Sequence, residues 1–116
     1  MELAMIGLGK MGLNMTIRLV RGGHRVVGYA LETKAVEEAV RNGAEGAYSL
    51  EEAVGKLNSP RIIWVMVPAG KATDDTIDKL SDLLSKGDIV IDGGNSNYKD
   101  SILHAALLKS KGIEFL

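Results

Sequence analysis

The stretch Gly7-Leu8-Gly9-Lys10-Met11-Gly12 restricts the fold of this chain more than any other feature. It is a G-x-G-x-x-G motif that follows a short apolar run and opens a segment with helical spacing. In that context Gly7 allows a tight turn, Gly9 lets the backbone approach a pyrophosphate, and Gly12 lets the helix pack closely on the sheet. The free N–H groups of the helix N-terminus attract the phosphates. The motif therefore predicts a dinucleotide site, and a glycine turn without a ligand is the alternative.

Apolar runs and helical patterns alternate along the rest of the chain. Strands are expected in the run ELAMIGLG and at residues 25–29, 44–48, 61–67, 89–92 and 113–116, with helices between them. The run at 61–67 is apolar without alternation, which is typical of parallel strands that are buried on both faces. This alternation predicts an α/β fold, a doubly wound parallel sheet of the Rossmann type, in one domain over residues 1–116.

Each expected helix carries apolar residues at helical spacing that define its buried face. The sets are Met11, Met15 and Leu19; Val36, Ala39 and Val40; Leu50, Ala53, Val54 and Leu57; Ile77, Leu80 and Leu84; and Leu103, Ala106, Leu107 and Ser110. A capping box from Ser49 to Glu52 begins the third helix, and the fourth is expected to end near Ser85. We assign Trp64 to the core.

The composition excludes several classes of protein. The net charge is −1 with both signs spread along the chain, which gives no field for nucleic acid or an anionic membrane surface. The chain has no cysteine, so disulfides and thiolate chemistry are excluded. No apolar run approaches the ~20 residues of a membrane-spanning helix, and no signal peptide is visible. We therefore expect a cytoplasmic protein.

The scattered polar candidates are assigned structural roles. His24 follows a glycine pair, which suits a turn or a cap, and His104 lies in a helix without a carboxylate partner in sequence. Asp74, Asp75 and Asp78 fall near the start of a helix, where acidic side chains compensate the helix dipole. No spacing supports a metal site or a nucleophilic triad, so we expect no metal and no catalytic residue within this chain.

Three residues after the second strand are the candidates for binding the adenosine ribose. An NAD site has Asp or Glu there for the ribose 2′-OH, and an Arg nearby suits the 2′-phosphate of NADP. The sequence has Ala30-Leu31-Glu32 instead. Glu32 either reaches the ribose or is a solvated residue at a helix start. Within the glycine motif, Lys10 is expected to face solvent, whereas Met11 either contacts the nicotinamide or belongs to the helix core.

Two further strand ends are candidates for the nicotinamide half of the site. Val67-Pro68-Ala69 ends the fourth strand at the switch point of the sheet, where we expect backbone contact with the cofactor. The stretch DIVIDGGNSNY at 88–98 ends a strand in two glycines, which let a ligand approach the backbone. Asn95 follows, and its amide offers both a donor and an acceptor. A simple Gly-Asn turn is the alternative.

Three segments of the chain resemble the N-terminal domain of 6-phosphogluconate dehydrogenase. They are IGLGKMGLNM, MVPAG followed by DDTIDKL, and GDIVIDGGNSNYKDS, and the resemblance runs over all 116 residues. The segment D-G-G-N-S-x-Y is the most specific, because related β-hydroxyacid dehydrogenases usually carry D-x-S-T there. The MVPAG segment is similar to the shorter, NAD-linked branch of bacteria and archaea.

The resemblance implies an enzyme of the pentose phosphate pathway that oxidatively decarboxylates 6-phosphogluconate to ribulose 5-phosphate and CO2, with NAD or NADP. It implies that Gly7, Leu8, Gly9, Lys10, Met11 and Gly12 bind the cofactor phosphates. Val67, Pro68 and Ala69 would run beside the cofactor, and Asn95 would contact both nicotinamide and substrate. The ribose-binding positions fall at Ala30, Leu31 and Glu32, where the family's usual residues are absent.

The same resemblance implies that other parts of the enzyme lie beyond Leu116. These are the substrate loop, a catalytic Lys and Glu, and a helical domain that forms a homo-oligomer, a dimer or a tetramer. Two alternatives stay open. One is a β-hydroxyacid dehydrogenase of the 3-hydroxyisobutyrate type, and the other is a non-catalytic dinucleotide-sensing module, which would not need Asn95.

Overall fold

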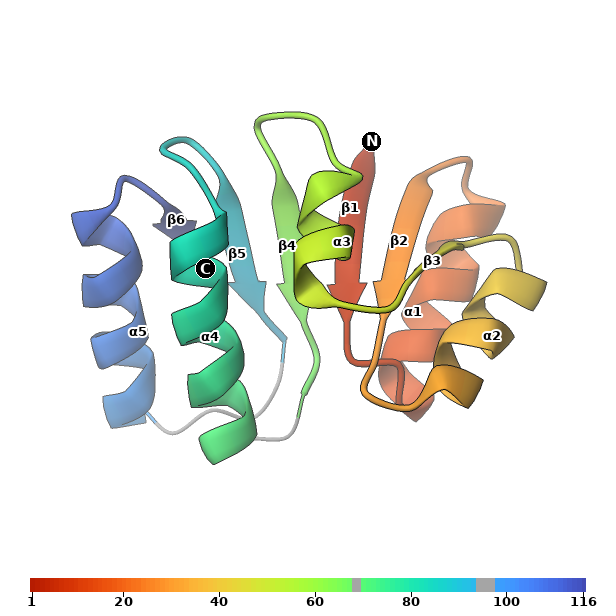
Figure 1. Cartoon of the computed structure of the whole chain (residues 1–116), viewed down its shortest axis with the longest axis horizontal. Helices are drawn as coiled ribbons and strands as arrows, with labels where there is room; N and C mark the ends of the chain where they lie inside the picture. Colours follow the sequence, from red (N-terminus) through yellow and green to blue (C-terminus); the bar gives the residue numbers. More distant parts are fainter. Residues whose placement is uncertain (68–69, 94–97) are drawn as a thin grey trace.

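The strands form one parallel sheet in the order β3-β2-β1-β4-β5-β6 (Figure 1). The computed structural model describes residues 1–67, 70–93 and 98–116. The strands are β1 (Glu2–Ile6), β2 (Arg25–Tyr29), β3 (Glu45–Ala47), β4 (Ile62–Val65), β5 (Ile89–Asp92) and β6 (Glu114–Phe115). The helices are α1 (Lys10–Arg21), α2 (Thr33–Arg41), α3 (Leu50–Gly55), α4 (Lys71–Leu83) and α5 (Tyr98–Ser110). The predicted doubly wound α/β fold is confirmed.

Two boundaries differ from the sequence-based prediction. Strand β4 is shorter than the predicted 61–67. The neighbouring strand β1 ends at Ile6, where the chain turns away from β4. Beyond Val65 the two strands share one more backbone hydrogen bond, which Met66 N–H donates to the Ile6 carbonyl at 2.7 Å. Helix α4 ends at Leu83 rather than near Ser85, because Leu84 already has extended backbone angles.

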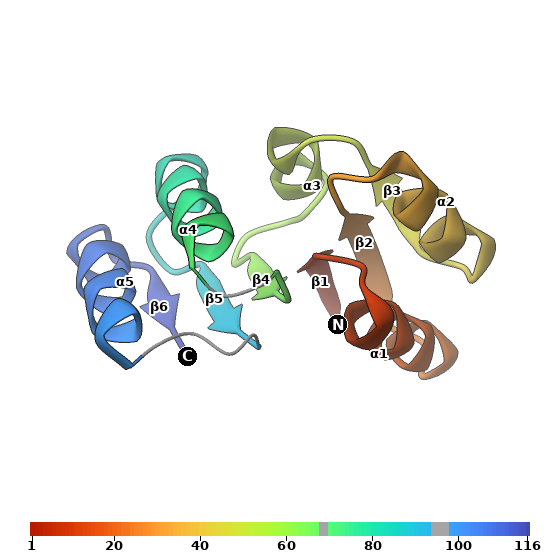
Figure 2. The same ribbon diagram turned by 90° about the horizontal axis from the view of Figure 1, so that it is seen from below.

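The order of the strands reverses between β1 and β4. Helices α3, α4 and α5 pack on one face of the sheet, and α1 and α2 pack on the other (Figure 2). This is the arrangement that right-handed crossovers produce when a chain winds outward from the centre of a sheet in both directions. In such sheets, ligands bind at the carboxyl ends of the strands, where the winding direction changes.

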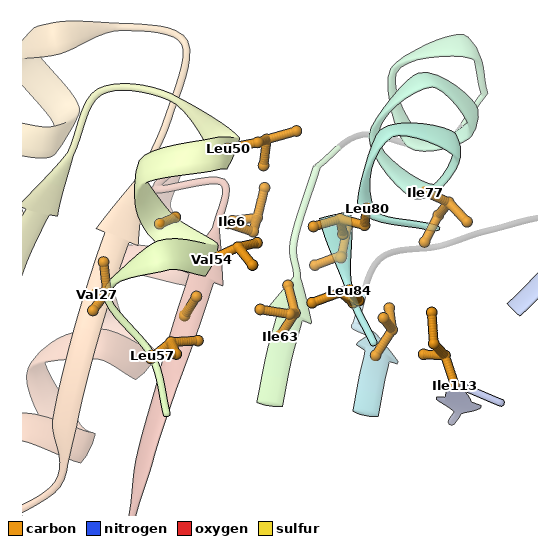
Figure 3. Packing of buried hydrophobic residues seen from close by; sticks show 14 of the residues in the cluster. Ile6, Val27, Leu50, Val54, Leu57, Ile63, Ile77, Leu80, Leu84 and Ile113 are labelled. Atoms are coloured by element: carbon orange, nitrogen blue, oxygen red, sulfur yellow. The ribbon is translucent and has the colours of Figure 1, made fainter. Parts of the chain in front are cut away.

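The larger hydrophobic cluster lies beneath α3, α4 and α5 (Figure 3). Its strand residues include Ile6, Val27, Ile63, Val65 and Val90, each almost fully buried. The predicted face of α3 is confirmed, since all of its apolar residues are buried. The predicted capping box is also present, because Ser49 Oγ accepts a hydrogen bond from Glu52 N at 3.0 Å.

The predicted face of α5 is wrong. Leu103 is 67% exposed, and among residues 101–110 of this helix His104 and Leu108 are the buried ones. The helix carries apolar residues on nearly every side, so spacing alone does not select its inner face. His104 is buried because its Nε2 lies 2.8 Å from Asp74 Oδ1 of α4 and its ring meets that of Phe115 edge to face. Asp74, assigned to the helix dipole, therefore also joins α4 to α5.

Two smaller corrections concern the other face of the sheet. Met11 is 68% exposed and Val40 is 45% exposed, although both were assigned to buried helix faces. The buried residues of α1 are Gly12 and Thr16 instead. Small residues occupy these positions because the helix lies close to the sheet there. Trp64, predicted as a core residue, is only half-buried and packs against the cluster beneath α1 and α2.

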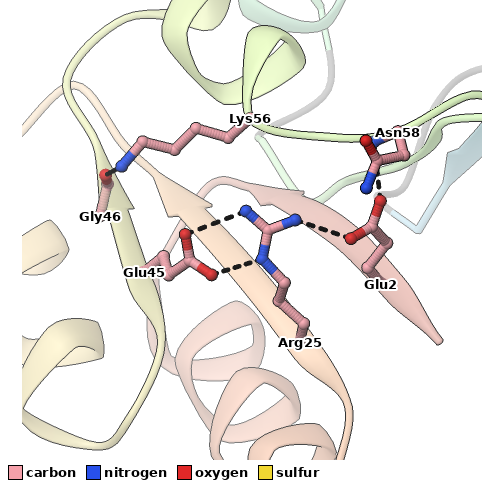
Figure 4. Close-up of polar contacts among 6 residues, drawn as sticks. All are labelled: Glu2, Arg25, Glu45, Gly46, Lys56 and Asn58. Atoms are coloured by element: carbon pink, nitrogen blue, oxygen red, sulfur yellow. Dashed lines mark hydrogen bonds and ion pairs between the residues drawn. The ribbon is translucent and has the colours of Figure 1, made fainter.

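An ion-pair network joins the amino ends of β1, β2 and β3 (Figure 4). Arg25 contacts Glu2 at 2.6 Å and also pairs with Glu45 on β3. Glu2 also accepts a hydrogen bond from Asn58 N at 2.7 Å. The Asn58 N–H and the Arg25 guanidinium lower the pKa of Glu2, and Arg25 lowers the pKa of Glu45. This network lies at the edge of the sheet opposite the ligand-binding edge, so we assign it a structural role.

Candidate functional site

A cleft of about 1110 Å³ lies at the carboxyl ends of the central strands. Its walls come from segments that are distant in sequence: the loops after β1, β2, β4 and β5, and helix α4. The lining residues from the loops and strand ends are Ile6, Gly7, Leu8, Gly9, Lys10, Met11, Gly12, Tyr29, Ala30, Leu31, Glu32, Met66, Val67 and Gly93. The volume and the location fit a cofactor site in a sheet of this topology.

Two of the motif glycines are required by the fold itself. Gly7 has φ of +101°, and a Cβ there would lie 2.8 Å from the backbone C and O of Met66. A Cβ on Gly12 would lie 2.1 Å from the carbonyl oxygen of Gly7. Both contacts are with backbone, which has no rotamer to change. Gly7 and Gly12 therefore let the first turn of α1 fold back against the end of β1.

Gly9 is different, because the described structure does not require a glycine there. Its φ of −66° and ψ of −170° are allowed for any residue. A Cβ at Gly9 would meet nothing within 4 Å. The missing side chain therefore leaves the backbone open to the cleft, as contact with a ligand requires.

The N-terminus of α1 is free to bind an anion. Gly9 is its N-cap, so no side chain satisfies the first N–H groups, and the first turn contains no acidic residue. The unpaired N–H groups and the helix dipole both favour negative charge at this position. The site thus combines an open backbone with an uncapped helix end, which suits a pyrophosphate.

The other two residues of the motif both lie at the mouth of the cleft. Lys10 is exposed, as predicted for a residue that faces solvent. Met11 is 68% exposed and lines the cleft, so it does not belong to the helix core, and its contact with the nicotinamide stays a prediction.

The end of β2 supplies the next wall of the cleft. Ala30, Leu31 and Glu32 all line it, and Leu31 is 92% exposed. Glu32 is the N-cap of α2, and its side chain makes no capping hydrogen bond. It therefore stands at a helix start and at the cleft at the same time, so both interpretations of Glu32 stay open.

Helix α4 forms a wall that the sequence analysis missed. Lys71, Ala72, Asp75, Thr76 and Lys79 line the cleft. These residues recur at intervals of three and four along the helix, so they share one face of it. This helical spacing is the signal in the sequence from which the wall could have been predicted. Lys79 also pairs with Glu51 of α3 at 3.1 Å, so an ion pair links the two helices beside the cleft.

The predicted nicotinamide half is only partly within the described residues. Val67 lines the cleft, whereas Pro68, Ala69 and Asn95 lie outside the described residues. Gly93 also lines the cleft, but the structure gives it a different reason from the predicted one. A Cβ on Gly93 would lie 2.3 Å from Trp64 Nε1 and 2.4 Å from Met66 Sδ, so this glycine makes room for two protein side chains.

The described residues contain no cluster of three or more His, Cys, Asp or Glu side chains that could hold a metal ion. The His104–Asp74 pair borders a small hollow of about 280 Å³ between α4 and α5.

Across residues 1–67, 70–93 and 98–116, no helix is long and apolar enough to cross a membrane.

The glycine motif, the uncapped α1 and the sheet topology all point to a dinucleotide-binding domain. Residues 2–116 match the family described as the NAD binding domain of 6-phosphogluconate dehydrogenase. The chain belongs to this family. The resemblance seen in the sequence is therefore confirmed, and so is the expectation of an NAD(P)-binding domain.

Individual relatives agree with this assignment. The chain is 44% identical over 105 residues to "6-phosphogluconate dehydrogenase, NAD(+)-dependent, decarboxylating" of Haloferax volcanii. This match covers 90% of this chain and 35% of that protein. The chain is 42% identical over 120 residues to "6-phosphogluconate dehydrogenase, decarboxylating" of Homo sapiens, covering 99% of this chain and 25% of that protein. The chain spans 25% to 39% of the length of these curated relatives and others that it matches.

A solved structure of a 6-phosphogluconate dehydrogenase matches the whole chain. The 6-phosphogluconate dehydrogenase of Plasmodium falciparum, which was studied in apo form and with NADP+ and 6-phosphogluconate, superposes with a TM-score of 0.92 at 30% identity. The match covers 100% of this chain and 26% of that one. The 3-hydroxyisobutyrate dehydrogenase of Mycobacterium tuberculosis superposes with a TM-score of 0.90 at 26% identity, over 98% of this chain and 38% of that one.

Proposed function

We propose that this chain binds NAD(P) for an enzyme that oxidatively decarboxylates 6-phosphogluconate to ribulose 5-phosphate and CO2. The observation that carries the binding site is Gly9, an N-cap whose missing side chain serves no purpose within the described structure. The reaction is proposed from the relatives, whose names specify decarboxylating 6-phosphogluconate dehydrogenases.

The proposed site runs across the carboxyl edge of the sheet. Residues 7–12 hold the pyrophosphate, and Ala30, Leu31 and Glu32 hold the adenosine ribose at one end. Val67, Pro68 and Ala69 border the nicotinamide at the other end. Asn95 contacts the nicotinamide on one side and the substrate on the other, and Met11 contacts the nicotinamide through its thioether.

A bound NAD(P)+ would supply the acceptor for the hydride that leaves C3 of the substrate. The work of this chain is then orientation, because hydride transfer needs donor and acceptor carbons held close and aligned. The groups that move protons belong to parts of the enzyme beyond this domain. We further propose a homo-oligomer in the cytoplasm that acts in the pentose phosphate pathway.

Binding and turnover test this proposal separately. We expect this chain to bind NAD+ and ADP in calorimetry and to form no ribulose 5-phosphate from 6-phosphogluconate and NAD+. The complete enzyme should oxidise 6-phosphogluconate in preference to 3-hydroxyisobutyrate. A preference for 3-hydroxyisobutyrate would establish the β-hydroxyacid dehydrogenase alternative, and dinucleotide binding by a complete protein without any turnover would establish the sensing alternative.

Coenzyme choice follows from the end of β2. Leu31 offers no cation to the 2′-phosphate of NADP, and Glu32 at the cleft opposes its negative charge. Ala30 lacks the carboxylate that would bond the 2′-OH of NAD, a charge-assisted bond worth about 1.5–3 kcal/mol. We expect a modest preference for NAD that Ala30→Asp sharpens. Dissociation constants for NAD+ and NADP+ in both proteins measure it, and tighter NADP+ binding by the parent would contradict it.

A further inference from the structure

The side chains of Trp64 and Met66 lie beside the end of the cleft that is opposite the adenosine site. Trp64 lies on β4 and Met66 follows Val65, the last residue of that strand. The two are two positions apart, and both pack with the cluster on the face of the sheet that α1 covers. Trp64 Nε1–H donates a hydrogen bond to Met66 Sδ at 3.2 Å. Indole has a single polar hydrogen, and this contact fixes the end of an otherwise flexible thioether side chain.

Met66 is the residue at which the loops of the site meet. Its backbone N–H bonds to Ile6, the last residue of β1, and its backbone C and O lie against Gly7. A Cβ on Gly12 would lie 3.6 Å from its Cβ, and one on Gly93 would lie 2.4 Å from its sulfur. Met66 therefore lies against the first and the last glycine of the motif, Gly7 and Gly12, and against Gly93, which follows β5.

The orientation of the dinucleotide along the cleft determines which half of it lies near Met66. The adenosine ribose is bound at the end of β2, so the other half extends from the pyrophosphate toward the ends of β4 and β5. Met66, Val67 and Gly93 line that end of the cleft. A change in the position of Met66 would therefore affect the nicotinamide half and leave the adenosine half in place.

We infer that Met66, fixed by the indole N–H of Trp64, is a positioning residue for the nicotinamide half of the bound cofactor. The inference rests on the proposed function, since it assumes that a dinucleotide occupies the cleft. Met66 acts by setting the distance between the glycine motif and Gly93. Nothing in the sequence motifs predicted this role, because the run RIIWVMV has the composition of an ordinary buried strand.

Calorimetry with two ligands tests the inference. Met66→Leu keeps the volume of the side chain but removes the sulfur acceptor. We expect the affinity for NAD+ to fall about threefold to tenfold while the affinity for ADP changes less than about twofold. Met15→Leu is the matched control, because Met15 packs with the same hydrophobic cluster without lining the cleft. It should leave both affinities unchanged.

Trp64→Phe removes the N–H donor and keeps an aromatic ring. Trp64→Phe and Met66→Leu each remove the same hydrogen bond, one through its donor and the other through its acceptor. The double variant should therefore lose no more NAD+ affinity than the more affected single variant. Additive losses would show that the two residues act independently and would overturn the coupling. Trp64 is the only tryptophan, so its emission in the parent should respond to NAD+ and not to ADP.

The outcomes separate this inference from the proposed function. A parent chain that binds neither ADP nor NAD+ contradicts the proposed function and, with it, the inference. A parent that binds both, with a Met66→Leu variant that loses ADP and NAD+ in parallel or loses neither, contradicts the inference alone. An equal response of Trp64 emission to ADP would also overturn it, because the indole would then not report on the nicotinamide end.

Discussion

Replacing Gly12 with alanine is expected to destabilise the folded domain by about 2–3 kcal/mol or more. The new Cβ would lie 2.1 Å from the carbonyl oxygen of Gly7 and 3.1 Å from its carbonyl carbon. Neither atom belongs to a side chain, so the clash is relieved only if the turn after β1 or the start of α1 moves. The free energy of unfolding in urea, followed by the emission of Trp64, measures the loss.

Gly55→Ala is the matched control for this variant. Gly55 also lies in a helix, but a Cβ there meets nothing within 4 Å. Alanine in a helix is favoured over glycine by about 0.5–1 kcal/mol, so the control should be neutral or more stable. Equal stability of Gly12→Ala and the parent would show that the α1 turn yields easily, and the packing role of Gly12 would be wrong.

The fold was predictable because its signals are repeated along the chain. Each strand is a short apolar run, each helix has its own spacing, and each interval between them is short, which favours a doubly wound parallel α/β sheet. Strand β3 lies within the predicted residues 44–48, and the capping box at Ser49 followed from a pattern of four residues. Strand ends were less predictable, because the end of β4 depends on where its neighbour β1 turns away.

The inner face of α5 could not be predicted, for a reason that lies in its neighbours. Periodicity identifies a buried face only where polar residues mark the other faces, and in α5 the polar residues are not gathered on one side. The decisive contact is His104 with Asp74, two residues 30 positions apart. The same limit applies to Gly93, whose sequence context indicated a ligand, whereas its neighbours in space are Trp64 and Met66.

The glycine motif itself was predictable as a set, but the separate tasks of its members were not. Sequence treats Gly7, Gly9 and Gly12 alike. The structure divides them, since two are required by the approach of backbone to backbone and one is not. Only this division makes it possible to remove ligand binding without removing the fold.

Gly9→Val is expected to abolish most cofactor binding and to leave the domain folded. The backbone angles of Gly9 suit valine, and the surrounding space within the described structure is empty. Exchange of glycine for valine at an N-cap costs about 1 kcal/mol, which a folded domain tolerates. The two methyl groups would instead occupy the space that a pyrophosphate needs in order to reach the N–H groups of α1. Overlap and lost charge-assisted bonds together predict a loss of about tenfold to a hundredfold in affinity.

Three ligands locate the effect of Gly9→Val along the cofactor. NAD+ and ADP both contain the diphosphate and should lose affinity together, whereas adenosine, which lacks it, should bind as it does to the parent. This pattern differs from the one expected for Met66→Leu, which spares ADP. Gly55→Val is the control, since it adds the same side chain at a helical position with free space and no cleft nearby. If folded Gly9→Val binds NAD+ with parental affinity, the diphosphate does not pass over Gly9, and the open N-terminus of α1 has another purpose.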